Sequence, residues 1–211
     1  MNKLKKLSIS VFMIVMMLAS CQLAAAQTTV PELKHFAVQG LSFDYPAANE
    51  LEDHSSQAGQ HLVIQGANKA QIMIVSRYVQ INSAAELAAA RHEVVDSFIE
   101  TMWKEIHEQD PNVSRSPAQI EVAGAQAVGV KLRAILNNEP GNAEIYSLQL
   151  GRRLVLLSLI GSDREIAASA PAWLEIRRSL KLEVSTESET VASESFRDVF
   201  RSVGASLVFH K

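Results

Sequence analysis

The stretch VGVKLRAIL at residues 128–136 decides the fold class of this chain. Apolar residues occupy every second position, and Gly129, Lys131 and Arg133 lie between them. Successive side chains of a β-strand point to opposite faces of a sheet, so this alternation predicts a strand with one buried face and one more polar face. We therefore expect a sheet that packs against a core on one side.

Further strands are predicted around this one, at residues 119–122, 143–150 and 154–160. The near-continuous apolar run of the last of them favours a central strand that is buried on both faces. Between the strands we expect turns, one over residues 137–142 with Pro140 and Gly141, the other over residues 151–153.

The N-terminal half of the domain also shows strand patterns, at residues 35–39, 41–45, 61–65 and 70–79. Gly40 joins the first two strands tightly, and Pro46 ends the second. The last two strands form a predicted hairpin around residues 66–68. Residues 47–60 are rich in Glu, Asp, Ser and Gly, which is typical of a polar loop.

Two helices are predicted, each opened by a capping box. After the first box, at residues 83–86, apolar residues recur three or four positions apart, at Leu87, Ala90, Val94, Phe98, Met102 and Ile106. That face should cover the sheet. After the second box, at residues 162–165, Pro171 is expected to begin the main helical stretch, with Trp173 facing inward. Residues 181–184 close the domain as a short strand.

Most of these strands are connected as hairpins, and only two helices interrupt them. This order predicts an α+β fold, an antiparallel β-sheet flanked by helices.

Several segments resemble a known family. They are GLSFDYP at residues 40–46, the long capped helix, DPNV at residues 110–113, VLLSLIG at residues 155–161 and the last helix with Pro171 and Trp173. Together they are similar to the PsbP-like fold, and in particular to DcrB-type bacterial lipoproteins. The resemblance covers residues 33–184. It implies an α/β/α sandwich in a cell-envelope lipoprotein that works by binding partners, and it carries no catalytic residue over to this chain.

Residues 1–26 have the pattern of an export signal, in which a basic start precedes an apolar run. LASC at residues 18–21 resembles a lipobox, whose cysteine receives a lipid. Cys21 is the single cysteine of the chain, so no disulfide framework is expected. Residues 27–32 would form a tether, and the lipid on Cys21 would hold the domain to the membrane on its periplasmic side. The alternative is cleavage after Ala26, which would leave a secreted protein.

Charge limits the classes of partner. The chain carries 20 basic and 23 acidic residues, and removal of the signal takes three of its lysines away. An acidic surface repels phosphate backbones, so we expect no nucleic-acid partner. Two arginine pairs, Arg152 with Arg153 and Arg177 with Arg178, are expected either as solvated side chains or as a basic spot for an acidic partner.

Catalytic and cofactor motifs are missing from the sequence, which has no GxSxG elbow, no P-loop and no GxGxxG. We therefore expect neither an enzyme nor a bound cofactor. Weak candidates for a metal site are His54 and His61 with Glu50 and Asp53, because imidazole and carboxylate are ligands of Zn²⁺ and similar ions. Their spacing is not tight, and a solvated acidic loop is the better explanation. A small-ligand or metal-binding protein, or a hydrolase, remains the alternative.

Residues 185–195 are mostly Ser, Thr and Glu, which predicts a flexible linker. The segment 196–211 then places Phe196, Val199, Phe200 and Val203 on one amphipathic face. We expect this face to bind a partner or to fold back on the chain's own sheet. The expected function is that of a non-enzymatic envelope lipoprotein, a protein-binding or scaffold module whose partner is an envelope protein of unknown identity.

Overall fold

The computed structural model describes residues 31–56, 59–67, 69–79 and 83–182. The chain divides into two compact units, Met1–Pro31 and Glu32–Lys211, and the fold below belongs to the second. Several predicted features lie outside the described residues: the export signal with Cys21, most of the tether, the linker, and the segment with Phe196, Val199, Phe200 and Val203. No described helix is both long and apolar enough to cross a membrane.

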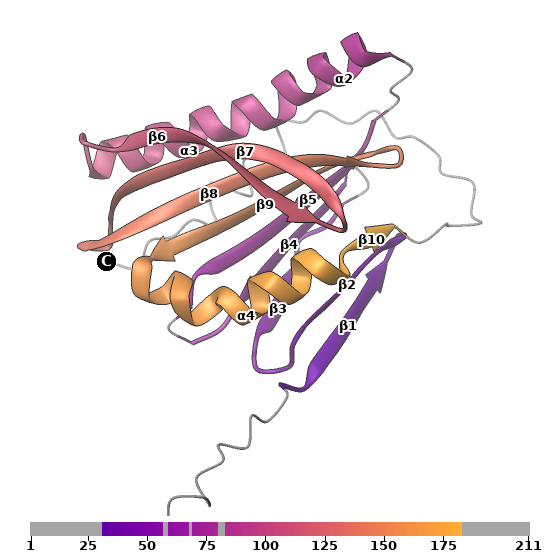
Figure 1. Ribbon diagram of the computed structural model, residues 1–211, viewed down its shortest axis with the longest axis horizontal. Coiled ribbons are helices and arrows are strands. Elements are labelled where there is room, and N and C mark those ends of the chain that lie inside the picture. The colour runs from indigo at the N-terminus through magenta and orange to yellow at the C-terminus, as the bar shows by residue number, and fades with distance from the viewer. Residues whose placement is uncertain (1–30, 57–58, 68, 80–82, 183–211) are drawn as a thin grey trace, which may run out of the picture. The chain divides into compact units, whose positions relative to one another are not determined.

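A seven-stranded antiparallel sheet forms the centre of the domain (Figure 1). Its strands are β3 (Glu50–Asp53), β4 (Gln60–Gln65), β5 (Gln71–Tyr78), β6 (Ser114–Val122), β7 (Ala125–Leu136), β8 (Glu139–Leu150) and β9 (Arg153–Ser162). Across the sheet they lie in the order β3-β4-β5-β9-β8-β7-β6. β9 therefore lies in the middle and is buried along nearly its whole length, which confirms the prediction made from its apolar run.

A second sheet joins the two ends of the domain. It contains β1 (Leu33–Val38), β2 (Leu41–Pro46) and β10 (Lys181–Leu182), in the order β1-β2-β10. The hairpin predicted around Gly40 is confirmed, and Lys181 pairs with Ser42 of that hairpin. The closing strand thus belongs to the small sheet and not to the large one.

Helices cover both faces of the large sheet (Figure 1). On one face α2 (Ala84–Arg91), a π-helical turn η1 (His92–Asp96) and α3 (Ser97–Gln109) follow one another, and on the other face lie α4 (Asp163–Ser179) and the small sheet. Each face has its own apolar core, with Phe98 and Met102 of α3 in one and Trp173 and Ile176 of α4 in the other. The predicted α+β class, an antiparallel sheet flanked by helices, is confirmed.

Only part of the long helical run covers the sheet. Its apolar side is buried from Val94 onward, whereas α2 has no buried residue, and Leu87 and Ala90 are only half-buried. The hydroxyl of Ser83 accepts a hydrogen bond from the backbone N–H of Glu86 at 3.2 Å, so the helix begins at its predicted cap. The apolar spacing continues beyond the point where the sheet ends, which is why the sequence overstated the buried length.

The turn before β8 is shorter than expected. It consists of Asn137 and Asn138, whose φ angles of 52° and 65° are those of a type I′ hairpin turn. Pro140 and Gly141, which the sequence placed in this turn, belong to β8 and pair with β7.

Two further boundaries differ from expectation. The loop expected over residues 47–60 contains β3, whose only contribution to the core is Leu51, so its hydrophobic signal is weak. Pro171 lies inside α4 and not at its start. The helix begins at the predicted box, where Ser162 and Glu165 each accept the other's backbone N–H with a side-chain oxygen.

Candidate functional site

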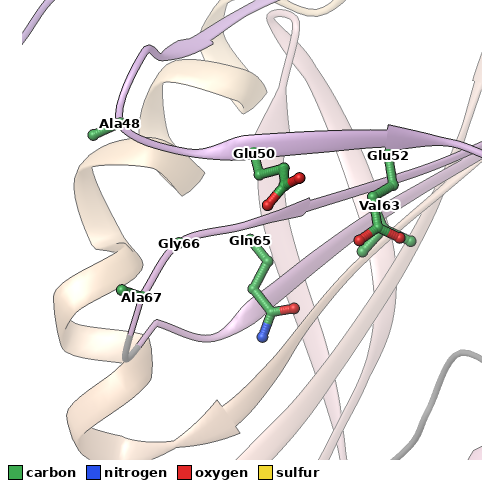
Figure 2. A pocket seen from close by; sticks show the side chains of 7 residues that line it. All are labelled: Ala48, Glu50, Glu52, Val63, Gln65, Gly66 and Ala67. Atoms are coloured by element: carbon green, nitrogen blue, oxygen red, sulfur yellow. The ribbon is translucent and has the colours of Figure 1, made fainter.

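The outer edge of the large sheet carries an open recess of about 350 Å³ beside β3 (Figure 2). It is lined by Ala48, Glu50, Glu52, Val63, Gln65, Gly66 and Ala67. In the pairing of β3 with β4, Glu50 lies opposite Gln65 and Glu52 lies opposite Val63. These four side chains therefore share one face of the sheet, as Figure 2 shows.

This is the face that α3 covers farther along the sheet. Met73 and Val75 of β5 belong to the apolar core under α3, but among the described residues neither β3 nor β4 contributes to that core. The recess thus lies where the helical layer no longer fills the face.

The recess is acidic. Both Glu50 and Glu52 are exposed, and within the described part of the chain Glu50 has no ion-pair partner. Lys69, on the turn beyond the recess, donates a hydrogen bond to Oδ1 of Asn49 at 3.2 Å and not to a carboxylate of the recess. A ligand in this recess would therefore meet two carboxylates and one amide.

Two of the predicted metal candidates, His54 and His61, lie side by side on the same face. The backbone N–H of His54 donates to the carbonyl of His61 at 2.8 Å, and the two ring centroids are 5.5 Å apart. Nε2 of His54 also lies 3.0 Å from Oε2 of Glu52. The acidic recess thus continues directly into a pair of imidazoles.

His61 is almost fully buried, with 1% of its surface exposed. Its Nε2 lies 3.2 Å from Sδ of Met73, and its Nδ1 has no hydrogen-bond partner among the described residues. Burial, with a smaller effect of His54, lowers the pKa of His61 to about 4, although Asp53 acts in the opposite direction. The imidazole is therefore neutral at neutral pH.

The other two metal candidates do not join the histidines. Asp53 lies opposite Leu62, on the other face from Glu52, and its Oδ1 accepts the backbone N–H of Ser55 at 2.9 Å. Glu50 lies in the recess. In the part of the chain that the structure describes, no three His, Cys, Asp or Glu side chains form a metal-binding group. The four predicted residues therefore do not make one site.

The sequence did not point to Met73, although its Sδ lies 3.2 Å from Nε2 of His61. A methionine in an apolar strand indicates a core position, and 12 residues separate Met73 from His61. Glu52 belongs to the same acidic stretch of the sequence as Glu50 and Asp53, and it contacts His54 because strand alternation places Glu50, Glu52 and His54 on one face.

A second hollow, of about 440 Å³, lies beside the C-terminal end of α4. Its lining is more apolar and includes Leu150, Leu180 and Leu182 together with Arg178. Leu182 is the last described residue, so the hollow lies where the chain continues into its undescribed C-terminal part.

The two arginine pairs differ from expectation. Arg152 is exposed at the turn before β9, but Arg153 is buried and cannot belong to a basic surface. On α4, the guanidinium of Arg177 lies 5.5 Å from the ring centroid of Trp173, and Arg178 forms an ion pair with a glutamate of the same helix.

No family model matches the chain, and no curated protein matches its sequence. Among solved structures, cyanobacterial PsbP (CyanoP) from Synechocystis sp. PCC 6803 is similar with a TM-score of 0.48 and 9% identity, over 76% of this chain and 98% of that one. A protein from Bacteroides thetaiotaomicron has a TM-score of 0.46 and 10% identity, over 81% of this chain and 57% of that one. LpqN of Mycobacterium tuberculosis, described as involved in cell envelope biogenesis, has a TM-score of 0.42 and 14% identity, over 72% of this chain and 91% of that one.

Proposed function

We propose that this chain is a lipid-anchored protein of the bacterial cell envelope, a non-enzymatic module that binds a partner protein on the periplasmic side, as the resemblance to DcrB-type lipoproteins implies. The observation that carries the binding role is the acidic recess at the edge of the large sheet, where Glu50 and Glu52 lie beside the amide of Gln65. Its lining offers two carboxylates, one amide and the backbone, which are groups that a basic segment of a partner would contact.

The partner that fits this recess is an extended segment with basic side chains. β3 is an edge strand of the large sheet, so the backbone groups on its outer side have no partner strand among the described residues. An extended segment can pair with such an edge through main-chain hydrogen bonds. A lysine or arginine on the matching face of that segment would lie next to Glu50 or Glu52. Each cross-strand charge pair contributes roughly 0.2–1 kcal/mol, and its main effect is to fix the register and the choice of partner.

Carbodiimide crosslinking of intact cells tests this contact, because it joins a carboxylate directly to a neighbouring lysine amine. Peptide mass spectra should show Glu50 or Glu52 bonded to a lysine of the partner. The double variant Glu50→Gln/Glu52→Gln should lose both the adduct and co-purification of the partner. Glu108→Gln, at an exposed site on α3, should keep both. A partner that stays bound to the double variant would show that this recess is not the contact site.

The membrane anchor is a separate part of the proposal and depends on the lipobox. Mass spectrometry of the mature N-terminus should find lipid on Cys21, and Cys21→Ala should leave the precursor uncleaved or release the protein from membranes. A free N-terminus at Gln27 would instead show ordinary secretion and would contradict the proposed lipid anchor.

A further inference from the structure

The buried imidazole of His61 has an unusual environment. Its Nε2 is 3.2 Å from a thioether sulfur, which is a weak hydrogen-bond acceptor, and its Nδ1 has no partner among the described residues. A buried polar group without hydrogen bonds destabilises a fold. Leucine would fill the position without this cost, so the contacts among the described residues do not explain the imidazole.

The strand register places three donor side chains together. His54 lies directly across from His61, and Met73 pairs with Val63, so Met73 is the diagonal neighbour of His61 on the same face. Diagonal neighbours on adjacent strands are within reach of long side chains. One face of three consecutive chain segments thus presents two imidazoles and one thioether.

The geometry of these groups suits a shared ion. Metal–nitrogen and metal–sulfur bonds of roughly 2.0–2.3 Å place two donors of one ion about 3–4 Å apart. The contact between Nε2 of His61 and Sδ of Met73 falls within this range, at 3.2 Å. The 5.5 Å between the ring centroids of His54 and His61 also allows a nitrogen of each ring to reach the same ion.

His54 has the surroundings of a metal ligand as well. A histidine that binds a metal through one nitrogen usually donates its other N–H to a carboxylate, which fixes the orientation of the ring. Nε2 of His54 makes this contact with Glu52, at 3.0 Å, and Nδ1 is left for an ion. The side chain of His54 is 41% exposed, so an ion can enter from this side, past the carboxylates of the recess.

We propose that His54, His61 and Met73 form a binding site for monovalent copper, Cu(I). A thioether is a soft ligand that selects Cu(I), whereas zinc sites in proteins use thiolate, imidazole and carboxylate ligands. The site borders the proposed partner contact and shares Glu52 with it as the residue that orients His54, but neither Glu50 nor the edge of β3 supplies a ligand.

Cu(I) affinity measured by competition with bicinchoninate under ascorbate tests the proposal. The full chain with Cys21→Ala, which removes its only thiol, should bind one Cu(I) and should bind Zn²⁺ far more weakly. In this background Met73→Leu, His61→Gln and His54→Gln should each weaken Cu(I) binding at least tenfold. Two matched controls, Met102→Leu in the core under α3 and His92→Gln on the helix surface, should leave it unchanged.

X-ray absorption of the copper-loaded protein gives a readout that does not depend on the variants. It should show sulfur and imidazole scattering in the first coordination shell, with the sulfur lost in Met73→Leu. A first shell of nitrogen and oxygen alone would overturn the proposal. So would Cu(I) affinity that is the same in Met73→Leu and Met102→Leu. The exchange of Met for Leu nearly conserves the volume of the side chain, so both variants should fold.

Discussion

Nη1 of Arg153 donates a hydrogen bond of 2.7 Å to Oε1 of Gln60, although only 3% of the surface of Arg153 is exposed. Nη2 of the same guanidinium donates to the carbonyl of Gln39 and to the hydroxyl of Tyr78. The guanidinium carbon Cζ lies 3.9 Å from the centroid of the Tyr78 ring. Gln60 in turn donates to the carbonyl of Val38 at 2.7 Å. A buried cation in the large sheet therefore holds the turn of the β1–β2 hairpin in the small sheet.

We expect Arg153→Ala to lower the free energy of unfolding by about 2–4 kcal/mol, because it leaves the buried amide oxygen of Gln60 and two part-buried acceptors without this donor and opens a cavity. The neighbouring Arg152 provides a matched control, since its side chain is exposed. Arg152→Ala should stay within about 0.5 kcal/mol of the parent. Urea unfolding measures both, and equal stabilities of the two variants would contradict the role of Arg153.

Phe98→Ala should cost about 3–5 kcal/mol, because Phe98 is buried in the core under α3 and its removal leaves a large cavity. Leu87, on the same predicted face but in α2, is only half-buried. Leu87→Ala should therefore cost about 1 kcal/mol or less. Comparable losses for the two variants, measured by urea unfolding, would mean that α2 packs on the sheet as tightly as α3.

The buried imidazole of His61 predicts a pH dependence of stability in the metal-free protein. Its pKa falls from 6.5 to about 4 on folding, so between these values the unfolded chain binds more protons than the folded one. Stability should therefore fall as the pH falls through this window, by at most about 1.4 kcal/mol per pH unit.

His61→Gln should remove this slope, whereas the exposed His92→Gln should keep it. Unfolding free energies between pH 6.5 and 5 give the cleanest comparison, because most carboxyl groups titrate below that range. The same slope in His61→Gln and in the parent would show that His61 is protonated in the folded state.

Gly129→Ala should disrupt the contact between β7 and β8. A Cβ on Gly129 would overlap the backbone carbonyl of Ile145 on the neighbouring strand, so the strands would have to separate. Gly124, in the turn before β7, has a φ of 73° and open space around it. Gly124→Ala should lower the free energy of unfolding by only roughly 1–2 kcal/mol, because alanine must adopt the left-handed backbone conformation there. Gly129→Ala should lower it by clearly more. Thermal unfolding of the two variants decides, and a smaller loss at Gly129 would contradict this packing.

The elements that the sequence predicted best are those whose side chains meet the core in a regular pattern. The alternation at residues 128–136 and the apolar run at residues 154–160 correspond to β7 and the central β9, and Ser83 and Ser162 begin their helices. β3 was missed because it lies at the sheet edge and only Leu51 packs inward. A strand with so little buried surface leaves almost no hydrophobic period to detect.

The candidate site was less predictable than the fold. The sequence could name His54 and His61 as possible ligands, but it grouped them with Asp53, whose side chain the strand alternation turns to the other face. It gave no reason to add Met73, which belongs to a different strand. Chemistry that depends on which residues lie opposite one another requires the register, and register is set by the pairing of whole strands.

The sequence by itself determined the strand and helix types, their hairpin order and the α+β class, because these follow from local periodicity, capping and turn chemistry. Only the tertiary structure decided that the first hairpin pairs with the chain's closing strand and that Arg153 is buried. It also decided that an acidic recess leads to His61 and Met73. These features depend on contacts between residues far apart in the chain, and local periodicity carries no information about such contacts.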